Sequence, residues 1–103
     1  MYKLCVFIPK DHLESVKEAM FAVGAGTIGH YDHCCWQTAG QGQFRPLAGS
    51  HPHTGTEGQL ETVSEYKVEL VVEGHHVHAV IAAMKLAHPY EEPAYDVWQL
   101  ADI

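Results

Sequence analysis

Apolar and polar positions along the chain follow two different periods. Residues 2–8 and 59–72 have alternating patterns, and both faces of the first segment are apolar. These patterns predict strands, and apolar residues on both faces are typical of a central strand. Apolar residues recur at helical spacing from Leu13 to Val23 and from Val77 to Met84, with Leu86 widening the second stripe, so we expect two helices.

Turn and cap residues predict where these elements begin and end. Asp11 followed by Glu14 resembles a capping box, and Gly24 is placed to end the first helix in a left-handed conformation. Pro89 predicts the end of the second helix. Residues 28–38 indicate a second strand, residues 40–46 a separate extended piece with two glycines, residues 48–58 a loop, and residues 94–100 a last strand.

The order of these elements is strand, helix, strand, strand, helix, strand. This order is typical of an α+β, ferredoxin-like βαββαβ sandwich in one domain, residues 1–103, with two helices on one face of a four-stranded sheet. The other sheet face needs a cover, and its expected apolar residues are Phe7, Trp36, Val71 and Trp98. Because a broad apolar face on a monomer is an association surface, we expect an oligomer.

Composition narrows the classes of partner. The 103 residues carry 6 basic and 13 acidic side chains, a net charge of −7 at pH 7, with no basic cluster. Neither nucleic acid nor an anionic membrane is therefore an expected partner. No apolar run is long enough to span a membrane and no signal-peptide pattern opens the sequence, which favours a cytoplasmic location. The 3 cysteines, two of them adjacent, favour free thiols over a disulfide framework.

Four segments carry a resemblance to a known family. They are Gly-Ala-Gly-Thr-Ile-Gly-His-Tyr (24–31), Gly-Gln-Gly-Gln-Phe-Arg-Pro-Leu (40–47), the pair Glu65 and Glu69, and His-Pro-Tyr-Glu-Glu-Pro-Ala-Tyr-Asp (88–96). In this order they resemble the inserted PII/CutA-like domain of the Nif-three-like (YqfO) family. The resemblance implies that fold, a trimer and a sensory or regulatory role. The order of the elements itself predicts an extended hairpin excursion between strands 2 and 3. The family's two-metal site lies in a flanking body with no counterpart in these residues, so the resemblance implies no catalytic residue.

The corner at residues 88–93 and the glycine-rich segment are the main candidates for a ligand or subunit contact. Rigidly held polar groups on loops are the usual way in which a fold displays a site. The candidate residues are Gly40, Gly42, Phe44, Arg45, Glu65, Glu69, His88, Tyr90, Glu91 and Glu92. In the simplest structural interpretation the Tyr90 hydroxyl finds a polar partner. Arg45 then pairs with Glu65 or Glu69, and Glu91 or Glu92 accepts hydrogen bonds from backbone donors or from Arg45. The alternative role for Arg45 is to hold an anionic ligand.

Metal binding is a further hypothesis, because the sequence holds 9 histidines. The candidate ligands are His30, His33, His88, Glu91 and Glu92, with zinc or copper as the metal. On a strand, His30 and His33 face opposite ways, so these two histidines do not converge on one metal ion without other ligands. Two further groups could capture these ions adventitiously: the loop histidines of His51-Pro-His53, and His75, His76 and His78 at the start of the second helix.

Two hypotheses of function remain. The first is a non-enzymatic, oligomeric PII/CutA-like module that binds a small ligand, a divalent metal or a protein partner. The alternative is a metal-dependent enzyme or metal-tolerance protein that uses His88, Glu91 and Glu92. Nucleophilic catalysis by Cys34 or Cys35 has little support, because no orienting group or oxyanion loop lies at a recognisable spacing.

Overall fold

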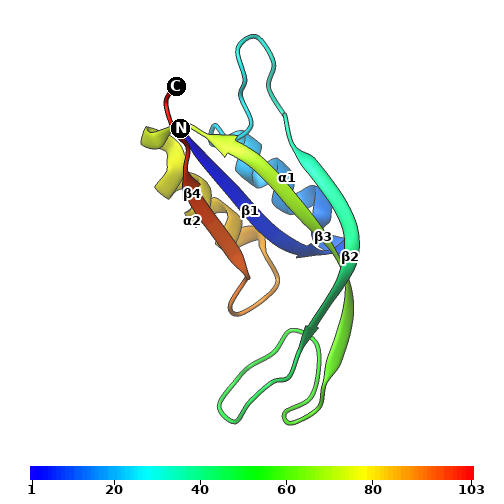
Figure 1. Ribbon diagram of the computed structural model, residues 1–103. Helices are drawn as coiled ribbons and strands as arrows, with labels where there is room; N and C mark the ends of the chain where they lie inside the picture. Colours follow the sequence, from blue (N-terminus) through cyan, green and yellow to red (C-terminus); the bar gives the residue numbers. More distant parts are fainter.

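The computed structural model describes all 103 residues, and its centre is a four-stranded antiparallel sheet. The strands are β1 (Tyr2–Pro9), β2 (Trp36–Phe44), β3 (Glu61–Val72) and β4 (Tyr95–Gln99), in the spatial order β2-β3-β1-β4. Two helices, α1 (Leu13–Ala22) and α2 (Val77–Ala87), cover one face (Figure 1). The α+β, ferredoxin-like βαββαβ prediction is confirmed, and β1 is a central strand as its two apolar faces indicated.

The core lies between the sheet and the two helices. Alternate residues of β1 and β3 meet the helix stripes there, as the periodic patterns predicted. The fully or almost fully buried side chains are Leu4, Val6, Ile8, Leu13, Val16, Met20, Ala25, Val68, Leu70, Val72, Val77, Val80 and Met84. Leu86 was wrongly expected to widen the stripe of α2 and is 91% exposed. It is two residues from Met84, about 200° around the helix, and so faces away from the core.

Helix α1 ends as predicted but begins differently. Gly24 has φ +106°, its N–H bonds to Phe21 O, and the N–H of Ala25 bonds to Met20 O, which is a Schellman ending. At the start, no side chain caps the helix, so the capping-box prediction is wrong. A 3₁₀ turn, η1 (Lys10–His12), leads into α1 instead.

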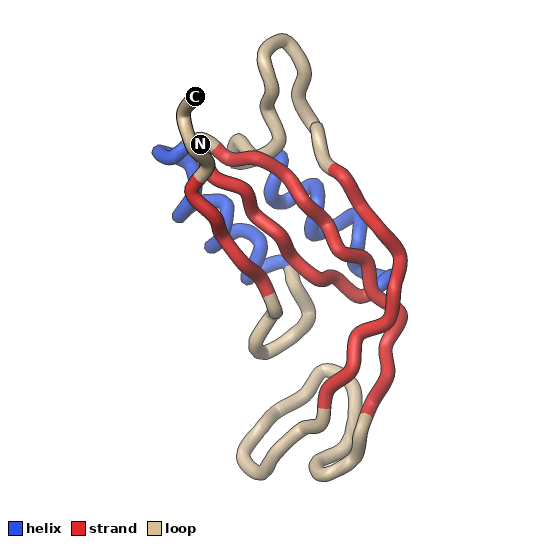
Figure 2. Tube along the Cα trace, in the orientation of Figure 1, coloured by secondary structure: helices blue, strands red, loops and turns tan.

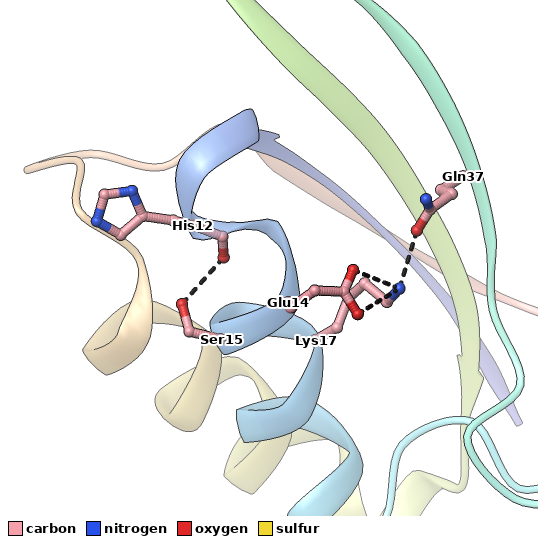
Figure 3. Close-up of polar contacts among 5 residues, drawn as sticks. All are labelled: His12, Glu14, Ser15, Lys17 and Gln37. Carbon is pink, nitrogen blue, oxygen red and sulfur yellow. Dashed lines mark hydrogen bonds and ion pairs between the residues drawn. The ribbon is translucent and has the colours of Figure 1, made fainter.

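The polar contacts of α1 tie it to the edge of the sheet (Figure 3). Lys17 Nζ bonds to both oxygens of Glu14 and, at 2.9 Å, to Gln37 Oε1 on β2. Glu14 therefore forms an ion pair within the helix and does not cap it.

The second helix is also preceded by a 3₁₀ turn, η2 (Gly74–His76). Neither helix is long and apolar enough to cross a lipid bilayer.

The second strand begins later than the sequence indicated. Residues 28–35 form a loop in which Ile28 and Tyr31 make an isolated bridge, and β2 then runs unbroken from Trp36 to Phe44. The predicted strand at 28–38 is therefore wrong at its start, and the predicted extended piece at 40–46 is mostly the continuation of β2. Gly29 and His33 have φ of +58° and +55°, and these left-handed residues turn the chain out of an extended path.

Beyond the sheet, β2 and β3 continue as a two-stranded arm. Residues Glu65–Val72 of β3 pair with β1, whereas Glu61–Ser64 pair only with β2. The loop of residues 45–60, predicted as loop from 48 to 58, joins the two strands at the far end of the arm (Figure 2). The loop curls back beside the corner between α2 and β4, and so the arm and the corner enclose a common space.

The uncovered sheet face is less apolar than expected. Rows of facing residues cross it in register, and Trp36, Val71, Phe7 and Trp98 do belong to it. Charged residues stand between them: Lys3, Lys67, Glu69 and Asp96. Trp36 and Trp98 are still 62% and 49% exposed, so two large aromatic side chains on this face are not covered by other parts of the chain.

Candidate functional site

The corner at residues 88–93 is anchored by a buried histidine. Helix α2 ends at Ala87, and His88 is extended with φ −72° and ψ 136°, as expected for a residue before proline. The ring lies 2.8 Å from Phe7 O through Nε2, and Nδ1 accepts the N–H of Tyr90 at 3.1 Å. Because Nδ1 accepts, the proton of the neutral ring is on Nε2. Burial lowers the pKa of His88, and the ring is therefore neutral at pH 7.

The Tyr90 hydroxyl donates to Glu65 Oε2 at 2.8 Å, which confirms that it finds a polar partner. Burial, followed by this bond, raises the pKa of Tyr90 far above its ordinary value. The Glu65 carboxylate reaches Tyr90 by lying over Gly42 on the neighbouring strand. A methyl group at Gly42 would overlap this carboxylate, so the glycine leaves the space that the bond requires.

The other predicted charged residues differ in whether they have a bonding partner. Glu91 Oε2 accepts the backbone N–H of His51 at 3.1 Å, which ties the 45–60 loop to the corner and confirms a backbone donor for one of the two glutamates. Arg45 is exposed and forms no ion pair, and Glu69 lies 4.0 Å from Lys67 instead. The predicted pairing of Arg45 with any of these carboxylates is therefore wrong. Glu92 is exposed and has no hydrogen-bond partner.

A cleft of about 510 Å³ lies between the arm, its loop and the corner. It brings the glycine-rich segment and the corner together within one chain. Its lining comprises Phe7, Gln41, Gly42, Gln43, Phe44, Arg45, Pro46, Leu47, Ser50, Pro52, His53, Thr54, Glu65, Tyr90, Glu91, Glu92 and Ala94. Most of the predicted contact residues are among them, whereas Gly40, Glu69 and His88 are not. The lining combines aromatic rings, amides and charges of both signs.

The predicted metal ligands do not converge. His30 and His33 lie in the 28–35 loop, at the end of the molecule away from the cleft (Figure 1). His33 Nδ1 is 3.2 Å from Asp32, and Nε2 is 3.6 Å from Glu18. At the corner, both nitrogens of His88 are bonded to backbone groups. No group of three or more His, Cys, Asp or Glu side chains is placed to hold a metal ion.

Comparison with known proteins identifies the lineage. No family model matches the chain. The "GTP cyclohydrolase 1 type 2 homolog" of Halalkalibacterium halodurans is 46% identical over 102 residues, 99% of this chain but 27% of the relative. The protein of the same name from Mycobacterium tuberculosis is 45% identical over 98 residues, 95% of this chain and 26% of the relative. A solved Bacillus cereus protein related to NIF3 superposes with a TM-score of 0.84 at 42% identity, covering 98% of this chain and 26% of that protein.

The chain is homologous to one segment of the Nif-three-like (YqfO) proteins. It spans about a quarter of their length, and the resemblance stated from the four sequence segments is confirmed. The fold of this chain is also that of CutA. CutA from Archaeoglobus fulgidus matches with a TM-score of 0.68 over 99% of this chain and 86% of its own, at 14% identity, which shows the fold alone.

Sequence reasoning missed two parts of the site in this chain. Phe7, from the end of β1, forms part of the cleft wall. His12 in η1 and His53 in the 45–60 loop lie with ring centroids 5.5 Å apart, and the His53 and Tyr90 rings are 6.4 Å apart. These contacts join distant parts of the chain, and no local pattern around either histidine indicates the other.

Proposed function

We propose that this chain is a non-enzymatic regulatory module, which assembles with copies of itself and binds a small ligand in the cleft. The observation that carries the proposal is the lining of the cleft. Arg45, an exposed cation without an ion pair, lies on the same cavity as the rings of Phe44 and Tyr90. An unpaired arginine beside aromatic rings suits a ligand with an anionic group and an apolar or planar part.

Binding is favoured over catalysis by the way in which the polar groups are used. A general acid or base needs a lone pair or proton that is free to reach the substrate. The His88 nitrogens are bonded to Phe7 and to the Tyr90 backbone, and the Tyr90 hydroxyl is bonded to Glu65. An enzyme that used His88 with Glu91 and Glu92 would have to break the backbone contacts that hold the corner. These groups therefore support the walls of a binding site.

Self-association is the second part of the proposal. The exposed Trp36 and Trp98 lie on the sheet face that no helix covers. Large exposed aromatic residues are enriched at protein interfaces. The resemblance to CutA and PII proteins favours three-fold closure, and a different protein partner on this face is the alternative.

A thermal-shift screen tests the ligand proposal, because a ligand that binds only the native state raises the melting temperature. GTP belongs in the screen because of the name of the longer relatives, and divalent cations because a neighbour of the same fold from Thermus thermophilus is named a divalent cation tolerance protein. We expect an anionic compound to stabilise the wild type and the Lys10→Met control, which loses an exposed cation that does not line the cleft, but not Arg45→Met. A shift that persists in Arg45→Met, or no shift with any compound, contradicts the proposal.

A further inference from the structure

Two imidazoles connect the 45–60 loop to the body of the molecule. His12 precedes α1, and His53 lies in the loop, with the two ring planes at 89° and the centroids 5.5 Å apart. The His12 ring points away from the polar contacts of α1 (Figure 3). Its Nδ1 atom is buried and has no hydrogen-bond partner. Native proteins rarely leave such an atom unpaired, and each exception calls for an explanation such as an ion or an ordered water.

The separation of the two rings fits a shared metal ion. Zinc binds imidazole nitrogen at about 2.0–2.1 Å, and two imidazoles on one tetrahedral ion then have centroids roughly 5 Å apart. The observed 5.5 Å is close to this separation. His53 is exposed and lies on a loop, so a small rotation of its ring meets no packed core.

We propose that His12 and His53 form a two-histidine site for a divalent transition-metal ion. Imidazole ligands select zinc, copper or nickel, whereas magnesium and calcium prefer oxygen ligands. No third histidine, cysteine, aspartate or glutamate completes a group around the pair, so solvent takes the remaining positions. Binding is therefore weaker than at a four-ligand structural site, and reversible.

The bound ion has a mechanical consequence. His53, Pro52 and Thr54 form part of the cleft wall, whereas His12 belongs to the helical layer. An ion held between His12 and His53 fixes the loop to the body and restrains this wall. The metal site itself requires only the two rings and the buried nitrogen, so it stands whether or not the cleft binds a small ligand.

Zinc titration of the tag-free chain tests the site. We expect His12→Gln and His53→Gln each to weaken zinc affinity by at least about tenfold, since even outer partners of metal ligands are worth about that factor. The matched control is His30→Gln, which removes an exposed imidazole from the other end of the molecule and leaves the affinity unchanged. In the same titration followed by calorimetry, magnesium gives no binding heat with the wild type or with any of the three variants.

Hydrogen exchange supplies a second, independent measurement. Zinc slows exchange in residues 45–60 of the wild type and of His30→Gln, and it has no effect there in His53→Gln. Equal zinc affinity in the wild type and His53→Gln overturns the proposal, because it assigns binding to the other exposed histidines. If His12→Gln does not fold, His53→Gln decides the question alone, since its side chain is exposed and no core contact depends on it.

Discussion

His88 shows how one side chain can make a loop rigid. It is 5% exposed, and its ring joins Phe7, near the end of β1, to the backbone of Tyr90 in the corner. A neutral imidazole serves both contacts, since one nitrogen donates and the other accepts. Protonation would replace the acceptor by a donor and break the bond from the Tyr90 N–H.

This arrangement predicts a loss of stability in acid. The pKa of His88 in the folded protein lies below its ordinary value of 6.5, so the unfolded chain takes up the proton first as the pH falls. The stabilisation from neutral His88 is complete above pH 6.5 and is lost progressively below that value. Urea unfolding at pH 7.5 and pH 5.0 measures the effect. Between these two pH values the free energy of unfolding should decrease more for the wild type than for His88→Asn, and His30→Gln should behave as the wild type does. An equal decrease in His88→Asn would show that other groups cause the acid effect.

Tyr90 and Glu65 should be energetically coupled. A hydrogen bond to a carboxylate contributes on the order of 1.5–3 kcal/mol, and partial exposure places this bond at the lower end. Tyr90→Phe and Glu65→Ala should each reduce the free energy of unfolding, and the double variant should lose less than the sum of the two. Arg45→Met and Glu92→Gln have no such bond to lose, and their effects should stay within about 0.5 kcal/mol. Strict additivity of the first pair would mean that the bond contributes nothing.

At the scale of elements, β2 and β3 are held in register although β2 contains two glycines. Gly40 faces Glu65 directly, and Gly42 lies under the Glu65 carboxylate. An added methyl group would meet open space at Gly40 and the carboxylate at Gly42. The two glycines therefore have different roles, even though they are neighbours on one face of the same strand.

Alanine substitution separates these roles. Gly42→Ala should displace Glu65 from Tyr90 and lower the unfolding free energy by about the value of that hydrogen bond, 1.5 kcal/mol. Gly40→Ala is the control and should be neutral or stabilising, because it restricts the unfolded chain without a clash. In a Glu65→Ala background the penalty at Gly42 should disappear. If it persists there, the glycine is required for the backbone and not for the carboxylate.

The elements differ in how far the sequence could predict them. The helices and β1 were predictable because their apolar periods are strong, and Gly24 marked a helix end by its conformational freedom. The start of β2 was not predictable, because Ile28 and Tyr31 favour strands. Nothing in the local sequence shows that Gly29 and His33 turn the chain. The cleft was only partly predictable. The glycine-rich segment and the 88–93 corner could be recognised in the sequence. The partner of Glu65 could not, because it depends on a strand register that places the carboxylate toward Tyr90 and not toward Arg45.

At the scale of the whole molecule, the helices leave one sheet face and its two tryptophans exposed. If this face mediates assembly, Trp36→Lys and Trp98→Lys together should convert the oligomer to single chains, because buried lysine charges oppose association. Leu86→Lys is the matched control, since Leu86 is 91% exposed on the helical side of the molecule. Analytical ultracentrifugation at micromolar concentration measures the result. A wild type that is itself a single chain would contradict the assembly proposal.

The projecting arm also changes how a single chain diffuses. The molecule measures 46 × 25 × 24 Å, and its radius of gyration is 14.5 Å, whereas a compact chain of this length is expected to have about 13 Å. An elongated particle has more friction with the solvent than a sphere of equal mass. A single chain should therefore elute early from a sizing column and rotate faster about its long axis than about its short axes. Elution volume alone would therefore overestimate the mass of a single chain, so the mass must be measured by sedimentation equilibrium or light scattering.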